Sequence, residues 1–160
     1  MDSLNQCSDE VMRHSVAVSA VAAMIGIAHK WQGKGTMEKL ALGGLLHDIG
    51  KPATFSVSDR IRFNGHVEAG LAIARPILAR LRFSHDSTEQ ILALVANHMR
   101  FGDIHRMKES TLKRFLRLPR FDEHLALHRA DCLGSHGHLD NYHFARRRLV
   151  VAFQVRDRDQ

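Results

Sequence analysis

Apolar residues recur at helical spacing along most of the chain, and no other feature restricts the fold as strongly. The pattern predicts helices over residues 9–30, 36–49, 66–82, 88–99, 110–118, 122–135 and 139–156. The stretch 50–64, GKPATFSVSDRIRFN, holds Gly, Pro, Ser and Asp with one short alternation, IRF, and indicates a long loop with room for a small hairpin. Ser87 and Gln90 stand in capping-box relation, which predicts a helix start at residue 88. The sequence therefore predicts an all-α fold.

The length and composition suit one globular domain, because 160 residues with 44% hydrophobic content can bury a sizeable core. The longest apolar run, Val16 to Ala28, has thirteen residues and is too short to span a bilayer. Residues 1–13 hold three acids against one arginine, which is the wrong sign for a signal peptide. We therefore expect a cytoplasmic protein with no membrane partner, in which Cys7 and Cys132 are free thiols.

The net charge of +6 is concentrated in the later part of the chain. Residues 1–98 carry 10 basic and 9 acidic side chains, whereas residues 99–160 carry 13 and 8. The basic residues are densest between positions 100 and 120, and such a segment attracts phosphates or an RNA backbone. The candidate RNA contacts are Lys113, Arg114 and Arg117. A solvated helix face, in which Arg and Lys serve helix propensity alone, is the open alternative.

Several ionisable side chains fall on apolar helix faces, where burial is unfavourable unless a partner is present. His14 lies between Val11 and Val18, so its imidazole should face the interior. His98 continues the apolar stripe of its helix, and Asp131 shares the apolar face of another. Taken singly, each is better explained as a hydrogen-bonded core residue than as a ligand.

The stretch LLHDIGKP, residues 45–52, places a His and an Asp side by side just before Gly50 and Pro52 end an apolar helix. Adjacent helical residues point about 100° apart, but a helix that is ending can turn both side chains toward one site. The ionisable set is then His14, His47, Asp48, His66, His98 and Asp131. Helical bundles build internal metal sites from such imidazoles and carboxylates on separate helices. Imidazole selects Fe, Ni or Zn over Ca and Mg, and carboxylate oxygen also suits Mn and Fe. We expect two ions, with Fe, Mn or Ni rather than Mg or Zn.

The order of these six residues resembles that of the HD-domain metal-dependent phosphohydrolase superfamily, which is named for the adjacent pair, and the resemblance extends over nearly the whole chain. More narrowly, the segments LLHDIGKPATF, IRFNGH, RLRFS, NHMRFGDIHRMKESTLKRFLRLPRF and LHRADCLGSHG are similar to the HD region of bacterial tRNA nucleotidyltransferases and poly(A) polymerase relatives. The resemblance implies a single HD domain over residues 1–160, an all-α bundle of six to seven helices with a long loop after the HD pair. No segment resembles the nucleotidyltransferase head, so CCA addition is not expected.

The resemblance also implies roles for the six residues. It assigns His14, His47, Asp48 and Asp131 to the core metal set, with Asp48 bridging two ions, and matches His66 and His98 to the further histidines of two-metal members. Two ions about 3.5 to 4 Å apart would polarise a phosphoryl oxygen and activate water for in-line attack. One departure is that the chain has GHVE where relatives commonly have GHE, which leaves the role of Glu68 open.

Three basic residues near these positions are candidate substrate contacts. Lys51 follows Asp48 by three residues, as in the HDIGK pattern of related phosphodiesterases, and would act with Asp48 in catalysis by neutralising a non-bridging phosphate oxygen. Arg100 and Arg129 stand two residues from His98 and Asp131, although an offset of two places a side chain on another helix face. The remaining histidines match no motif. Among them His124 and His128 have i,i+4 spacing that would clamp zinc with further ligands, and without such ligands we expect a surface pair.

These observations favour a metal-dependent phosphohydrolase or phosphodiesterase that acts on nucleotide or RNA-end phosphates, with 2′,3′-cyclic phosphates as one candidate. Two alternatives stay open. One is a di-iron oxygenase of the same superfamily, since the six ligands would be the same. The other is a tRNA-binding module in which the metal site is structural. The pattern predicts neither the oligomeric state nor whether a separate polymerase subunit is a partner.

Overall fold

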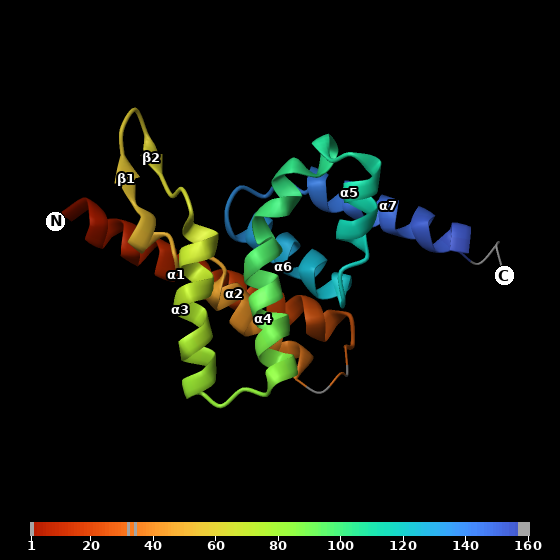
Figure 1. Cartoon of the computed structure of the whole chain (residues 1–160), viewed down its shortest axis with the longest axis horizontal. Coiled ribbons are helices and arrows are strands. Elements are labelled where there is room, and N and C mark those ends of the chain that lie inside the picture. The colour runs from red at the N-terminus through yellow and green to blue at the C-terminus, as the bar shows by residue number, and fades with distance from the viewer. Residues whose placement is uncertain (1, 32, 34, 157–160) are drawn as a thin grey trace.

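The computed structural model describes residues 2–31, 33 and 35–156, and in this part of the chain the fold is a helical bundle (Figure 1). The α-helices are α1 (Asp2–Ala28), α2 (Thr36–Leu46), α3 (His66–Arg80), α4 (His85–Asn97), α5 (Glu109–Leu116), α6 (Phe121–Gly134) and α7 (Asp140–Arg156). Two 3₁₀ helices, η1 (Pro52–Thr54) and η2 (His98–Arg106), and a hairpin of β1 (Ser56–Val57) and β2 (Ile61–Arg62) complete the described elements. The predicted all-α fold is confirmed, and the small hairpin after the HD pair projects from the bundle (Figure 1).

The starts of two helices lie several residues before the predicted positions. Helix α1 begins at Asp2 rather than at residue 9, because residues 2–8 contain no Gly or Pro that would break the helix. Helix α4 begins at His85 because Ser84, and not Ser87, is its N-cap and accepts a hydrogen bond from the Ser87 N–H at 3.2 Å. The predicted capping box at Ser87 was therefore wrong.

The 3₁₀ helix η2 was not predicted, and it continues the chain from α4 at His98. Its buried residues Phe101 and Ile104 lie three positions apart, which matches the three-residue turn of a 3₁₀ helix. A search for the 3.6-residue period misses such a segment. This short element turns the chain around the end of α4 and brings His98 to the centre of the bundle.

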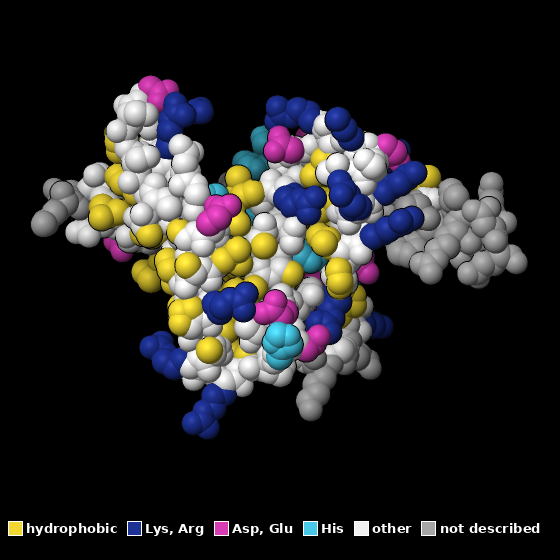
Figure 2. Space-filling view, in the orientation of Figure 1, with side chains coloured by type: hydrophobic (Ala, Val, Ile, Leu, Met, Phe, Trp, Pro, Cys, Tyr) yellow, Lys and Arg dark blue, Asp and Glu magenta, His cyan; other side chains and the backbone are white. Residues whose placement is uncertain are grey.

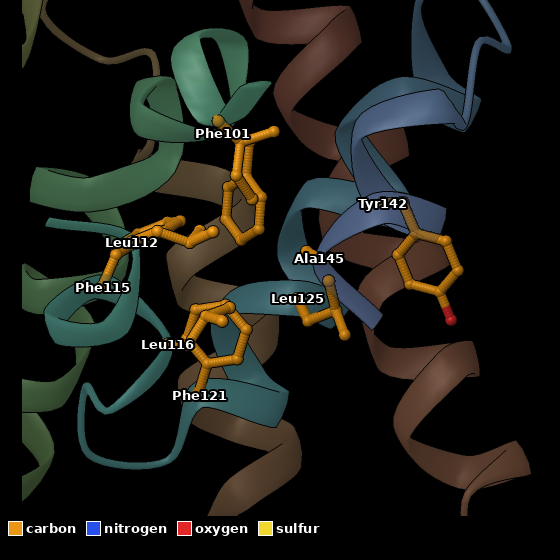
Figure 3. Close-up of a cluster of buried hydrophobic side chains, with 9 residues drawn as sticks. Phe101, Leu112, Phe115, Leu116, Phe121, Leu125, Tyr142 and Ala145 are labelled. Atoms are coloured by element: carbon orange, nitrogen blue, oxygen red, sulfur yellow. The ribbon is translucent and has the colours of Figure 1, made fainter. Parts of the chain in front are cut away.

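Three clusters of buried apolar side chains hold the helices together. One joins α1, α2, α4 and α6 through residues such as Val18, Leu40, Leu94 and Leu127. Another joins the end of α2 to α3 and α4. The third surrounds Phe101, which lies near α5, α6 and α7 (Figure 3). Its members are Phe101, Ile104, Leu112, Phe115, Leu116, Phe121, Leu125, Tyr142 and Ala145. Burial of this apolar surface is the main stabilising contribution to the bundle.

Two glycines allow helices to approach closely around the HD pair. A Cβ at Gly44 would lie 2.8 Å from the Cα of Ser19, so a larger residue there would push α1 away from α2. A Cβ at Gly50 would lie 2.0 Å from the carbonyl oxygen of His66, at the start of α3. The close approach of α1 to α2, and of the start of α3 to the turn at Gly50, therefore depends on the absence of a side chain at these two positions.

Helix α1 would be long and apolar enough to cross a membrane over Ser3–Ala28, judged by length and composition alone. The thirteen-residue apolar run thus belongs to a longer helix than the sequence prediction assumed. A core helix of a globular bundle passes the same test, and α1 has Val18 and Ala22 fully buried against its neighbours. These buried contacts make α1 part of the bundle, and 28% of its apolar window as a whole is buried.

Candidate metal centre

The HD pair lies where α2 ends. His47 is the C-cap of α2, with helical backbone angles of φ −56° and ψ −35°, and the chain makes further turns through Gly50. Because the helix stops there, the imidazole of His47 and the carboxylate of Asp48 both face the interior, and only 1% and 2% of these residues are exposed.

Four other elements bring partners to this pair. His14 comes from the middle of α1, His66 is the first residue of α3, His98 is the first residue of η2, and Asp131 lies on α6. Two groups of three have their ligand atoms close enough to hold one ion each, and the groups share Asp48. They are His14, His47 and Asp48, and Asp48, His66 and His98. The structure therefore brings all six predicted residues together.

The two carboxylate oxygens of Asp48 face different histidines. Oδ2 lies 3.3 Å from His47 Nε2 and 3.9 Å from His14 Nε2. Oδ1 lies 3.7 Å from His66 Nε2 and 3.6 Å from His98 Nε2. One carboxylate thus separates two pairs of imidazoles, which is the arrangement that a bridging ligand requires.

Asp131 closes the first group on its solvent side. Its Oδ1 lies 3.0 Å from His14 Nε2 and 3.7 Å from His47 Nε2. The side chains of His14 and Asp131 are partly exposed, whereas those of His47 and Asp48 are buried. The cluster therefore opens to solvent at its α1 and α6 edge.

The backbone orients all four imidazoles in the same way, because each ring places Nδ1 near a carbonyl oxygen. The carbonyls belong to Gly134 for His14 (3.4 Å), Gly44 for His47 (2.7 Å), Phe63 for His66 (2.9 Å) and Val95 for His98 (2.7 Å). A carbonyl only accepts, so each Nδ1 carries the proton and donates it. In the neutral rings the Nε2 lone pairs then point into the cluster, as they do in histidines that bind metals.

The donor atoms inside the cluster fit a cation. His66 Nε2 and His98 Nε2 face each other at 3.3 Å, and two lone pairs at this distance repel unless a proton or a metal ion lies between them. His47 Nε2 is buried and has no hydrogen-bond partner among the described residues. An unpaired buried nitrogen is unfavourable, and coordination would satisfy it. Imidazole nitrogen and carboxylate oxygen together suit a transition metal.

The charges of the cluster are strongly coupled. Burial by itself would lower the pKa of His47, but the nearby carboxylates of Asp131 and Asp48 raise it to about 9. Burial likewise favours a higher pKa for Asp48, yet contacts with His47 and His98 and the charge of Lys51 hold it well below its usual range. Burial also opposes ionisation of Asp131, whose pKa two histidines nevertheless keep low. The centre therefore favours positive charge between its carboxylates, which a proton or a metal ion supplies.

Lys51 lies at the rim of the cluster. Its Nζ donates to Asp48 Oδ2 at 2.5 Å and lies 5.6 Å from the centre of the Phe63 ring. The side chain is partly exposed, so the ammonium group can contact both the cluster and a ligand that arrives from solvent. The structure thus places Lys51 next to Asp48, at the side of the centre nearest the projecting hairpin.

The two candidate arginines contact other parts of the molecule. The Arg100 guanidinium lies 4.5 Å from the centre of the Phe115 ring and donates to Asn97 Oδ1 at 3.0 Å. Arg129 lies 5.5 Å from the Tyr142 ring centre. Within the described residues neither guanidinium contacts the six-residue cluster, as the offset of two positions along each helix would lead one to expect.

The candidate RNA contacts lie on α5 and at its C-cap residue Arg117, away from the cluster. Lys113, Arg114 and Arg117 are exposed, and Lys113 has Glu109 within 3.8 Å. Figure 2 shows Lys and Arg side chains gathered over the region that α5 occupies in Figure 1. An exposed surface of this kind is accessible to a phosphate backbone.

The predicted surface pair on α6 was wrong, because His124 and His128 are buried, with only 3% and 8% of each residue exposed. The His128 ring stacks on Phe101 at 4.2 Å with an interplanar angle of 3°, and its ring nitrogens lie 3.6 and 3.8 Å from Cys132 Sγ. Burial lowers the pKa of both histidines to about 4, so the rings are neutral. Helix α6 is covered on nearly all sides over residues 123–128, so the helical period of the sequence does not distinguish its buried residues from exposed ones.

A protein family matches most of the chain, and two known proteins match about a third of it each. The HD domain family matches residues 11–133. A segment of 61 residues is 44% identical to the CC-adding tRNA nucleotidyltransferase of Thermus thermophilus, and it covers 36% of this chain and 14% of that protein. A segment of 54 residues is 43% identical to an uncharacterised protein of Methanocaldococcus jannaschii, and it covers 33% of this chain and 32% of that protein. The chain thus spans much less than two thirds of the length of either relative.

Proposed function

The chain belongs to the HD domain family, whose members are generally metal-dependent hydrolases, and on this premise we propose that it hydrolyses phosphoesters of nucleotides or RNA ends, including 2′,3′-cyclic phosphates. The observation that carries the proposal is the position of Asp48 between two pairs of imidazoles. This arrangement supports a dinuclear centre. The proposed ligands are His14, His47, Asp48, His66, His98 and Asp131.

The proposed cofactor is a pair of Fe, Mn or Ni ions. Imidazole donors suit Fe and Ni and disfavour Mg, carboxylate oxygen also suits Mn, and these donor types by themselves do not separate the three metals from Zn. When bound, such ions supply Lewis acidity toward a phosphoryl oxygen and lower the pKa of water. The protein contributes the orientation of the donors, since four backbone carbonyls fix the four imidazole rings. Asp48 would contribute a bridging carboxylate with one oxygen toward each side.

Lys51 is the proposed phosphate contact. Its ammonium group now lies on Asp48 Oδ2, and a phosphate oxygen at the rim would offer it a second anionic partner. A cation beside the centre favours an anionic substrate, and this observation favours phosphoester hydrolysis over oxygenation of a neutral compound. Arg100 and Arg129 would contribute only if their side chains left Phe115 and Tyr142.

The test is an assay of the purified protein with 2′,3′-cyclic mononucleotides, in air and without oxygen, with the metal content measured. We expect hydrolysis under both conditions and its loss in Asp48→Ala. If the metallated protein hydrolyses no phosphoester with any divalent metal but consumes oxygen with an organic substrate, the oxygenase alternative replaces the proposal. If the metallated protein neither hydrolyses a phosphoester nor consumes oxygen but binds tRNA, the binding-module alternative replaces the proposal.

RNA is proposed as a second partner through the α5 surface. Changing Lys113, Arg114 and Arg117 together to Ala should weaken RNA binding and reduce its salt dependence by about 0.7 in log–log slope per lost contact with a single strand. Hydrolysis of a small cyclic nucleotide should change little, because the surface lies away from the cluster. Equal losses in RNA binding and hydrolysis would contradict separate surfaces. A cytoplasmic location and a single domain over residues 1–160 stay predictions.

A further inference from the structure

A cavity of about 250 Å³ opens beside the candidate metal centre, between η2 and the segment that joins α6 to α7. It shares His98 and Asp131 with the centre. Ligand pockets for drug-sized molecules are commonly about 300 to 1,000 Å³, so this one suits a single small group next to the site of chemistry. A phosphoester held at the centre would therefore have its organic part beside this cavity.

The floor of the cavity is uncharged. It is formed by the buried His128 and Cys132 of α6. Only 8% of His128 and 3% of Cys132 are exposed, the His128 ring stacks on Phe101, and burial of this kind favours the uncharged form of both groups. Among the described residues that line the cavity there is no Lys or Arg. The cavity is therefore poorly suited to a second phosphate and better suited to an uncharged group.

The walls offer flat and polarisable surfaces. The rings of His136 and His138 stack at 5.2 Å with an interplanar angle of 23°, and the His138 backbone N–H donates to His136 Nδ1 at 3.0 Å, which fixes that ring. Met99 faces them from η2, with 53% of the residue exposed. Imidazole rings and a thioether are favourable neighbours for a planar aromatic ring.

Polar atoms at the edge of the cavity come from the start of α7. The Asp140 carboxylate accepts hydrogen bonds, and the Asn141 amide both donates and accepts them. A planar ring with N–H donors on its edge, such as adenine, guanine or cytosine, matches this combination of stacking surfaces and acceptors. The residues that provide these surfaces and acceptors come from η2, α6 and residues 136–141, which meet only in the fold.

We infer that this cavity binds the nucleobase of the substrate, and that Met99, Gly102, His136, His138, Asp140 and Asn141 select nucleotides over other phosphoesters. The inference rests on the proposed phosphohydrolase function and deepens it. The phosphate would lie at the centre, near Lys51, and the base would lie against the paired histidine rings. The small size of the cavity accommodates one base, so the substrate is a mononucleotide or the terminal nucleotide of a strand.

Gly102 allows a sharp test. It lines the cavity, and a Cβ built there meets no atom within 4 Å, so a larger side chain can enter the cavity without a clash in the fold. Gly102→Leu should lower kcat/KM for 2′,3′-cyclic AMP by about tenfold or more, because the side chain would occupy the space of the base. The loss for glycerol 1,2-cyclic phosphate, which has the same ring phosphate but no base, should be much smaller. Asp103→Leu is the matched control, since its neighbouring exposed position does not line the cavity.

Equal losses on the two substrates, or no loss on either, would overturn the inference. Met99→Ala provides a second variant in case Gly102→Leu does not fold. It should also lower kcat/KM for 2′,3′-cyclic AMP more than kcat/KM for glycerol 1,2-cyclic phosphate. Metal content and melting temperature are measured for each variant.

A binding measurement separates failure of the inference from failure of the proposed function. A calorimetric titration of the wild-type protein with AMP measures binding and requires no turnover. If the wild type hydrolyses neither phosphoester, the proposed function fails. AMP binding that is present in the wild type and in Asp103→Leu but lost in Gly102→Leu would then still support the base site. Absence of AMP binding in the wild type would rule out the base site.

Discussion

Asp48 separates two groups of histidines, with His14 and His47 on one carboxylate oxygen and His66 and His98 on the other. The two groups are not equivalent. The first has Asp131 as a further donor, whereas the second consists of two imidazoles that face each other at 3.3 Å. Removal of Asp48 should therefore affect both proposed ions, and removal of a single histidine from the second group should affect one.

This difference gives a prediction for metal content. The purified wild-type protein should carry about two ions per chain, Asp48→Ala should lose most of both, and His66→Ala or His98→Ala should retain about one. Elemental analysis of the folded proteins measures this. His85→Ala, which changes an exposed histidine on α4, is the control and should retain both. At most one tightly bound ion in the wild type, kept with full activity in the His66 and His98 variants, would rule out the dinuclear centre.

Lys51 differs from the proposed ligands because it contacts the centre without donating a lone pair to it. Lys51→Ala should lower the turnover of a phosphodiester by about tenfold or more, because the contact with the phosphoryl group is lost, and leave the metal content intact, because no metal ligand is removed. Lys51→Arg keeps the positive charge and should retain more activity. Steady-state kinetics with metal analysis tests both. Loss of metal in Lys51→Ala would show that the residue instead supports Asp48.

At the scale of elements, α6 combines the candidate ligand Asp131 with two histidines that serve the core. His124 lies beside Phe121, and His128 stacks on Phe101, so both rings pack as neutral aromatic groups. The pKa of His124 in the folded chain is about 4, first because of burial and then because of the charge of Arg100. An imidazole in an unfolded chain titrates near 6.5.

These two pKa values predict a loss of stability in acid. Between about pH 6.5 and about pH 4 the unfolded chain binds the extra proton, so the free energy of unfolding decreases as the pH falls through this window. The stability that His124 contributes near neutral pH is on the order of 3 kcal/mol, and its loss is complete below the folded pKa. His124→Gln, which does not titrate, should therefore lose less stability than the wild type between pH 7 and pH 5. Urea unfolding at the two pH values measures the difference.

The control for this measurement is His85→Gln on α4, an exposed position whose side chain is not packed in the core. It should follow the wild type. Metal binding depends on pH in all three proteins alike, so the comparison between variants cancels that effect. Parallel stability curves for His124→Gln and the wild type would contradict the assignment of a buried neutral ring.

At the scale of the whole molecule, the candidate centre joins segments that are distant in the sequence. Its residues come from α1, the end of α2, the start of α3, η2 and α6, and the surrounding apolar clusters pack the same elements together. Six ionisable side chains gathered there are unfavourable for folding unless their charges and lone pairs are paired. A bound cation would therefore act as a cross-link among five elements.

This dependence on distant contacts explains which features the sequence could predict. The inward faces of His14 and His98 follow from local helical spacing, and the six-residue pattern follows from the order of residues along the chain. The stacking of His128 on Phe101 and the cavity at Gly102 depend on elements that meet only in the fold. The η2 helix was not predicted because its buried residues recur every three positions instead of every 3.6. The start of α4 was predicted wrongly because Ser84, three residues before Ser87, is the N-cap.

The cross-link leads to a prediction for the stability of the whole chain. Metal that binds the folded state and hardly the unfolded one stabilises by about 2.7 kcal/mol per site at a free concentration of 100 times Kd, so its removal should lower Tm by roughly 5 °C or more in a chain of this size. Thermal unfolding before and after chelation, with metal content verified, measures the shift, and re-added metal should restore it. Asp48→Ala, which should hold little metal, is the control and should not respond to the chelator. An unchanged melting curve of the wild type after verified metal removal would contradict a buried centre that links the helices.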